Sequence, residues 1–183
     1  GGRSGNRGRC AQPCRMSYDL LSGQDKPEAQ GYLLSPADLC LIDMLPALRE
    51  AGITSLKIEG RMKRPEYVAV VTQAYREVLD LEYSDNRQVR ADARKRLLKI
   101  FNRNFSTGFL QDAQTGFLST QKPNNRGVLL GRVVSQEASF STRIKLVDEL
   151  NIGDGLEIWV ARGKSPAFVV NDIQAEGRSV PSA

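Results

Sequence analysis

The spacing of apolar residues changes from helical to alternating partway along the chain, and this change limits the folds available to it. Apolar residues recur every three or four positions over 65–79 and 85–100, which is typical of amphipathic helices. Four later runs alternate apolar and polar residues, as half-buried strands do, at 127–134, 141–146, 155–160 and 168–173. We therefore predict a first domain over 1–115, a linker over 116–126 rich in Gly, Gln, Asn and Pro, and a β domain over 127–183.

The first domain shows the order of elements found in α/β proteins. Ser35 before Pro36 predicts an N-cap and a helix over 36–50, which would end at Gly52. Residues 53–59 predict a short strand after it, and helix–glycine–strand is typical of a (β/α) unit. We expect a partial (β/α) barrel remnant, because a whole barrel takes about 250 residues. With a small antiparallel β-barrel over 127–183, the predicted fold class is α/β plus β.

A glycine-rich loop with two cysteines opens the chain. Cys10 and Cys14 lie in it, and Pro13 disfavours a regular helix or strand. The loop also carries four arginines, at Arg3, Arg7, Arg9 and Arg15. Such a loop can hold a metal or cluster, form a disulfide or bind an anionic partner. It can also be a solvated basic loop in which the cysteines have no function.

Three charged residues follow the predicted strand at its carboxyl end. Glu59, Arg61 and Lys63 lie where barrel enzymes gather their active sites. Glu59 there could bind a cation, pair with an arginine or act as an acid or base, and a structural salt bridge is the simpler alternative. Cys40 lies among apolar neighbours, so we expect it to fill the core within the 36–50 helix.

Composition excludes some kinds of chemistry. The 183 residues include no histidine, so a His-containing zinc site, a Ser-His-Asp triad and a Cys-His dyad cannot be built from this chain. Three cysteines without a secretion signal favour a reducing, cytoplasmic compartment. The net charge of +5 and the pI of about 9.3 suit contact with a nucleic acid, although a solvated basic face would look the same.

Four stretches resemble the collagenase-like peptidase family, the U32 peptidases. The run from Asn6 to Arg15 matches an Asn-Arg-Gly-x-Cys-x-x-x-Cys-Arg motif of the family's core domain, and residues 32–71 are a second stretch that resembles the family. KIFNRNFSTGFL resembles a Phe-Asn-Arg-Gly-Phe-x-x-Gly segment of the family, with Asn104 in place of a glycine, and PNNRGVLLGRVV resembles the join to its C-terminal domain. Since the chain begins within the first motif, we expect a fragment of a longer protein.

The resemblance also implies a function. Family members carry two further cysteines upstream, so Cys10 and Cys14 would be metal ligands that complete the four thiolates of an iron–sulfur cluster. Several bacterial relatives hydroxylate a pyrimidine in tRNA or rRNA, which would make RNA the partner of the arginine loop and Glu59, Arg61 and Lys63 the catalytic candidates. The alternatives are a peptidase acting on a peptide substrate, as the family name implies, and a non-catalytic RNA-binding module.

Overall fold

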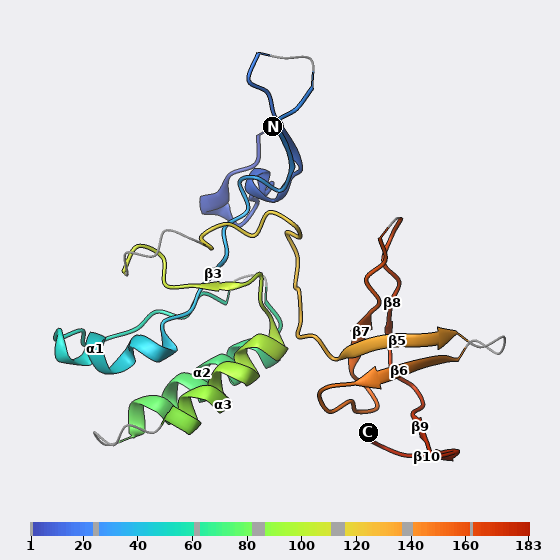
Figure 1. Cartoon of the computed structure of the whole chain (residues 1–183). Helices are drawn as coiled ribbons and strands as arrows, with labels where there is room; N and C mark the ends of the chain where they lie inside the picture. The colour runs from blue at the N-terminus through green and yellow to red at the C-terminus, as the bar shows by residue number, and fades with distance from the viewer. Residues whose placement is uncertain are drawn as a thin grey trace. The chain divides into compact units, whose positions relative to one another are not determined.

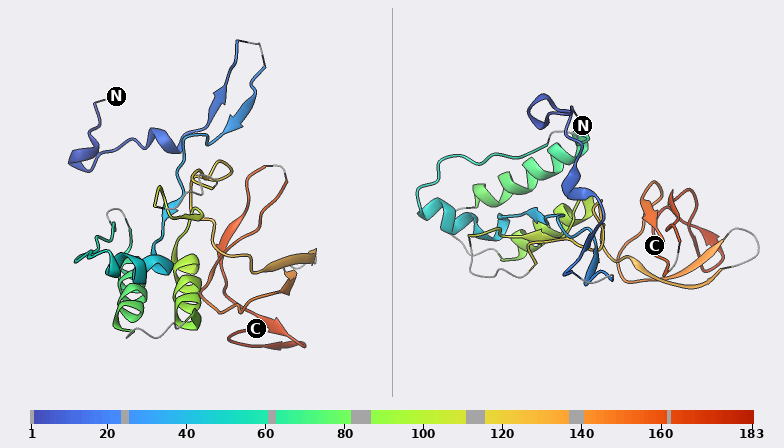
Figure 2. Two further views of the ribbon diagram at one scale, coloured as in Figure 1. Left: turned by 60° about the vertical axis from the view of Figure 1, so that its left-hand side comes forward. Right: turned by 90° about the horizontal axis from the view of Figure 1, so that it is seen from above.

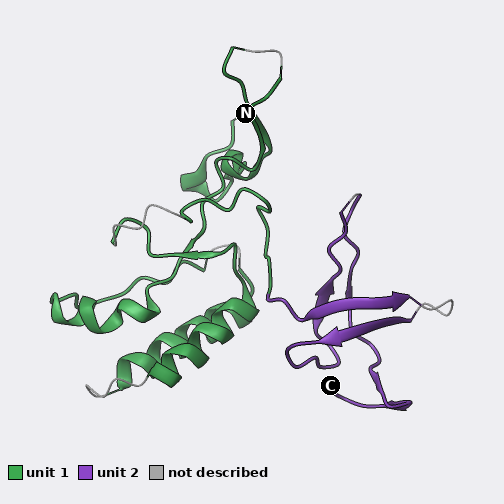
Figure 3. Ribbon diagram, viewed as in Figure 1, with its two compact units in different colours: residues 1–127 green, residues 128–183 purple. Residues whose placement is uncertain are grey.

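The computed structural model describes residues 2–23, 26–60, 63–81, 87–110, 116–136, 141–161 and 163–183. The chain divides into two compact units, Gly1–Gly127 and Val128–Ala183, shown in separate colours in Figure 3. The first unit contains all the described α-helices, and the second is built of short strands (Figure 1). Among the described residues, no helix is both long enough and apolar enough to cross a membrane.

The first unit begins with short turns and a hairpin and continues with helices. Its elements are the 3-10 turns η1 (Gly5–Arg7) and η2 (Pro13–Arg15), strands β1 (Tyr18–Leu20), β2 (Ala29–Gly31) and β3 (Asp38–Leu39), the 3-10 turn η3 (Ile42–Met44), helices α1 (Leu45–Glu50), α2 (Pro65–Asp80) and α3 (Arg87–Ile100), and strand β4 (Phe105–Ser106). β1 and β2 pair antiparallel. β3 and β4 pair in parallel, with Asp38 opposite Phe105.

Helices α2 and α3 pack side by side and form most of the core (Figure 2). α2 buries Val71, Ala74 and Val78, which lie on one face at helical spacing. α3 contributes Ala93 and Leu97 to the same core, and both helices confirm the predicted periodicity. Beside them lie Cys40, Ile42 and Leu45, of which Ile42 is completely buried.

The predicted helix over 36–50 is wrong in its first half. Asp38 N–H donates to Asn104 O at 2.9 Å and Cys40 N–H to Ser106 O at 3.0 Å, so these donors pair with the segment around β4 instead of within a helix. Ser35 is not an N-cap, and Cys40 is buried but lies outside any helix. The predicted end is confirmed: Gly52 has φ of 80° and its N–H donates to Arg49 O, as in a Schellman motif.

The predicted strand over 53–59 is also wrong. These residues have no regular structure and are mostly exposed. None of the described strands pairs with them through backbone hydrogen bonds. A strand needs a neighbour to pair its N–H and C=O groups. The sheets of the described residues are all two-stranded and none closes into a barrel, so the partial (β/α) barrel is not confirmed.

The second unit holds three antiparallel strand pairs among its described residues. They are β5 (Gly131–Gln136) with β6 (Thr142–Leu146), β7 (Gly155–Glu157) with β8 (Ala167–Val169), and β9 (Gln174–Ala175) with β10 (Arg178–Ser179). Leu150, Val170 and Ile173 form its small buried cluster. The four predicted strands are present in shorter form, while β9 and β10 have no counterpart in the sequence prediction. A closed β-barrel is not confirmed here either.

The segment predicted as a linker, 116–126, is hydrogen-bonded to the first unit where it is described. Ser119 is 1% exposed, and its N–H donates to Ser35 O at 2.7 Å. Further along, Arg126 N–H donates to Asn102 O, and Asn102 Nδ2 donates to the carbonyl oxygen of Gly127. These bonds attach the segment to Ser35 and to Asn102, which precedes β4.

Candidate functional site

The cysteine loop carries two free thiols four positions apart in the sequence, on a backbone that contains the turns η1 and η2. Cys10 is exposed and Cys14 half-buried, and neither forms a disulfide. Gln12 between them has a positive φ of 54°, which is rare for a residue with a side chain. Its N–H donates to Cys10 Sγ at 3.3 Å. Backbone N–H groups directed at sulfur are a feature of protein iron–sulfur sites.

The arginines of this loop divide into two kinds. Arg3, Arg7 and Arg9 are exposed, and Arg3 Nε donates to Arg9 O at 3.1 Å within the loop. Arg15 is half-buried and attaches the loop to the rest of the unit. Its Nη1 donates to Ser35 Oγ at 2.5 Å and to Pro36 O at 2.7 Å. Burial lowers the pKa of Arg15, and the nearby charge of Arg103 lowers it further.

Arg103 and Asp38 form an ion pair at the start of the parallel strands. Arg103 donates its backbone N–H to Asp38 Oδ2 at 2.9 Å and Nε to Oδ1 at 3.0 Å, and Nη2 also bonds Oδ1. Each side chain is only 21% exposed. Asn104, in the turn between Arg103 and β4, has a positive φ of 68°, a conformation that asparagine tolerates.

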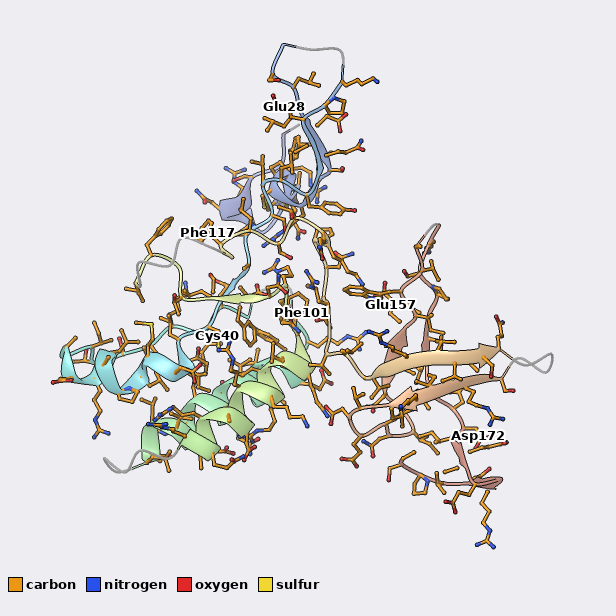
Figure 4. All side chains as sticks on the ribbon, viewed as in Figure 1. Glu28, Cys40, Phe101, Phe117, Glu157 and Asp172 are labelled. Carbon is orange, nitrogen blue, oxygen red and sulfur yellow. The ribbon has the colours of Figure 1, made fainter. Side chains whose placement is uncertain are left out.

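Lys63 lies against two aromatic rings beside this pair. Its Nζ is 2.8 Å from the centroid of Phe101 and 5.4 Å from that of Tyr67. The two rings meet edge to face at 6.2 Å, and Figure 4 labels Phe101 beyond the end of α3. The pKa of Lys63 is lowered to about 8, mainly by burial and then by Arg103 and Arg15, while Asp38 acts in the opposite direction. We call Arg15, Lys63 and Arg103 the cationic cluster.

Glu59, which was predicted to share a site with Lys63, has a different environment. Glu59 has a 69% exposed side chain, and its Oε2 lies 3.8 Å from Lys57 Nζ. Its charge contributes to the raised pKa of Tyr67, although burial is the main cause. Arg61 lies outside the described residues. The structure therefore brings Lys63 together with Arg15 of the cysteine loop, and leaves Glu59 on a solvent-exposed segment.

Sequence reasoning missed Asp38, Phe101 and Arg103 as members of this site. Phe101 and Arg103 belong to the Phe-Asn-Arg run, which is the signal that could have drawn attention to them. Asp38 was assigned to a helix end, so its contact with Arg103 could not be foreseen. Cys40 belongs to the core: burial raises its pKa, and Tyr75 Oη lies 4.0 Å from its Sγ. It lies in the core and not on the cysteine loop.

The arrangement offers two kinds of chemistry. Cys10 and Cys14 can act as soft metal ligands, and the cationic cluster can hold an anion. Among the described residues, no group of three or more Cys, Asp or Glu side chains could hold a metal ion alone. The loop offers two thiols, which is half of the number that a four-thiolate cluster requires.

Comparisons with known proteins agree on the family. Residues 1–117 match peptidase family U32. A tRNA hydroxylation protein of Bacillus subtilis is 41% identical over 60% of this chain and 28% of its own length. A 23S rRNA 5-hydroxycytidine synthase of Escherichia coli is 32% identical over 97% of this chain and 28% of its own. A collagenase of Porphyromonas gingivalis is 36% identical over 93% and 43%.

The chain spans less than half the length of these relatives. No solved structure matches it significantly. The family match covers well over half of the 183 residues and includes the cysteine loop, Lys63 and Arg103. The chain belongs to peptidase family U32.

Proposed function

We propose that the chain is part of an RNA-modifying enzyme that hydroxylates a pyrimidine in tRNA or rRNA. The observation that carries this proposal is the basic cysteine loop, in which three exposed arginines precede two free thiols in sequence. Similarity to proteins named for tRNA hydroxylation and for 5-hydroxycytidine synthesis supports it. An enzyme that acts on tRNA or rRNA needs access to them, so a cytoplasmic location is part of this proposal.

An iron–sulfur cluster is the proposed cofactor, with Cys10 and Cys14 as two of its ligands. Their free thiols and the Gln12 N–H directed at Cys10 Sγ fit this role. The other two ligands would come from the complete gene product. When bound, the cluster would supply one-electron chemistry. Arg15, directly after Cys14, would fix the loop through its bonds to Ser35 and Pro36.

RNA would contact the exposed side of the loop. Arg3, Arg7 and Arg9 present guanidinium groups to solvent, and such groups pair well with backbone phosphates. Glu59, Arg61 and Lys63 are the proposed catalytic residues: Glu59 as acid or base, with the two cations binding the substrate. The parallel pairing of β3 with β4, between which lie the described helices α1, α2 and α3, supports the finer proposal that residues 1–115 belong to a (β/α) barrel.

A peptidase is the second candidate, favoured by similarity to a protein named collagenase. The absence of histidine leaves this chain without the usual base for a serine or cysteine nucleophile. Any hydrolytic machinery would have to come from elsewhere in the complete gene product. A module that binds RNA without catalysis is the third candidate, and the experiment below separates all three.

The test uses cells that lack the gene and carry the complete gene product or its variants. Mass spectrometry of digested tRNA and rRNA should detect a hydroxylated pyrimidine that is lost with the gene and restored by the unchanged protein. Cys10→Ala and Cys14→Ala should abolish both the nucleoside and the visible absorbance of the anaerobically purified protein. Cys40→Ala, a matched control in the core, should retain both. Glu59→Gln should abolish the nucleoside while unfolding at nearly the original temperature, because its side chain is exposed.

Three results would contradict this assignment. An unchanged nucleoside profile in the deletion strain would contradict the proposal that the protein is a hydroxylase. Cleavage of denatured protein by the purified product, dependent on Glu59 and without RNA binding, would favour the peptidase. Salt-dependent RNA binding without any change in nucleosides would favour the non-catalytic module, since each phosphate contact to a single strand contributes about −0.7 to the slope of log K against log salt.

A further inference from the structure

Three cations converge on one carboxylate in the first unit. Arg15 comes from the cysteine loop, Lys63 from the approach to α2 and Arg103 from the turn before β4. Asp38 is the acidic group that pairs with Arg103 and whose charge acts on both Arg15 and Lys63. Counting these four side chains with Lys63 protonated, the site carries three positive charges and one negative. The carboxylate of Asp38 offsets only one of the three positive charges, so a further anion would reduce the repulsion that remains among the cations.

The donors of the cluster are only partly used. Among the described residues, Arg15 engages Nη1 with Ser35 and Pro36, while Arg103 engages Nε and Nη2 with Asp38. A guanidinium has five N–H donors, so each arginine keeps at least one nitrogen for a further acceptor. Lys63 contacts the faces of Phe101 and Tyr67, and an ammonium has three N–H donors to offer.

The surroundings make these donors strong. Arg103 is 21% exposed, and Arg15 and Lys63 are half-buried. Charge-assisted hydrogen bonds are stronger where water is partly excluded. Arg15 and Arg103 are also held in place, by Ser35 and Pro36 and by Asp38, so little side-chain entropy is lost on binding. Two fixed guanidinium groups and one ammonium group are the donor set that proteins use for phosphate.

We infer that Arg15, Lys63 and Arg103 together bind a phosphate group. The phosphate can belong to an RNA backbone or be a free phosphate ion, and only the first source rests on the function proposed above. This site differs from the exposed loop arginines because it is partly buried. One of its members, Arg15, directly follows Cys14 in the sequence.

Binding should be linked to proton uptake by Lys63. The pKa of Lys63 is about 8, and the groups that face it are Arg103, Arg15, Asp38 and the ring of Tyr67. At pH 8 the amine is about half protonated, and a bound anion raises its pKa toward the ordinary value. Phosphate binding at this pH should therefore take up about half a proton.

Isothermal titration calorimetry in two buffers with different ionisation enthalpies measures this uptake. The 183-residue chain is titrated at pH 8 with inorganic phosphate and, separately, with a single-stranded RNA oligonucleotide. Lys63→Gln should weaken binding tenfold or more, as expected for the loss of one charge-assisted bond. Lys63→Arg should keep the affinity and lose the proton uptake, because arginine does not titrate. Any proton exchange that remains with this variant comes from the phosphate, and it is subtracted from the value for the unchanged chain. Lys145→Gln, an exposed lysine of β6, is the control for charge alone.

The two probes separate the sources of phosphate. Proton uptake with RNA that inorganic phosphate suppresses by competition supports the RNA backbone as the source. Uptake with inorganic phosphate but no RNA binding supports the site and counts against the proposed RNA partner. The inference is overturned if neither probe gives proton uptake in the unchanged chain, or if Lys145→Gln weakens binding as much as Lys63→Gln. RNA binding without proton uptake would contradict the phosphate site and would still agree with RNA as the partner.

Discussion

The pair formed by Asp38 and Arg103 should be a major stabilising contact of the first unit. Asp38→Asn removes the charge that accepts from Arg103 N, Nε and Nη2, while the cations Arg15 and Lys63 stay nearby. Hydrogen bonds to charged groups contribute about 1.5–3 kcal/mol. The variant also leaves the charge of Arg103 without its partner in a half-buried site, which adds to the loss of the bonds themselves. We expect the free energy of unfolding to fall by about 2–3 kcal/mol.

Urea unfolding at neutral pH, followed by circular dichroism, measures this change against a matched control. Asp43→Asn breaks the ion pair with Arg94, whose N–O distance is 2.9 Å but whose side chains are 52% and 40% exposed. Exposed pairs contribute about 0–1 kcal/mol, so the control should lose less than about 1 kcal/mol. Both variants remove one carboxylate charge, and the comparison therefore measures the combined effect of burial and of the additional hydrogen bonds that Asp38 accepts.

The result that refutes the reasoning is an Asp38→Asn variant as stable as Asp43→Asn. A second measurement tests the origin of the loss. If repulsion within the cationic cluster contributes, added phosphate should recover part of the stability of Asp38→Asn and have little effect on Asp43→Asn. Equal recovery in both would mean that phosphate acts by general exclusion from the protein surface and not through the cluster.

The remaining predictions concern the core, a strand pair and a titration. Ile42→Ala, at a completely buried site, should cost about 2–5 kcal/mol in urea unfolding, whereas Ile152→Ala at a 49% exposed site should cost below about 1 kcal/mol. Gly131→Ala should disrupt the β5–β6 pair, because its Cβ would overlap a backbone oxygen of β6, while Gly155→Ala meets no atom within 4 Å; protection of the β5–β6 amides from hydrogen exchange checks this. Lys63 binds its proton more weakly in the folded state, with a pKa of about 8 against 10.5, so the stability of the unchanged chain should rise between these pH values relative to Lys63→Met; a flat difference would contradict this.

The parts of the fold that the sequence predicted are those governed by local spacing. Residues 65–80 form a helix because their apolar positions fall on one face and Pro65 suits a first helical turn, and both signals lie within the segment. Gly52 was predictable as a helix end for the same reason, since only a residue tolerant of positive φ fits there. The alternating runs of the second unit likewise predicted β5–β8.

The first half of the 36–50 segment could not be predicted locally. Asp38 and Cys40 direct their backbone N–H groups to Asn104 and Ser106, more than sixty residues away. Their own segment, with Ser-Pro-Ala-Asp at its start, has a good helix signature, and tertiary pairing overrides it. The 53–59 strand failed for the opposite reason: its pattern suits a strand, but the described part of the chain provides no neighbouring strand.

The candidate site shows the same division between local and tertiary information. Residue types were enough to select Cys10, Cys14 and Lys63, because thiols and cations near turns stand out in any sequence. The pKa of Lys63 is lowered mainly by burial and then by Arg103 and Arg15, which lie on segments that no spacing rule connects. Glu59 is only four residues from Lys63 in sequence, yet its carboxylate lies next to Lys57 on an exposed segment. Sequence neighbours were therefore a poor guide to the partners of Lys63, because the charge of this site is assembled from four separate parts of the chain.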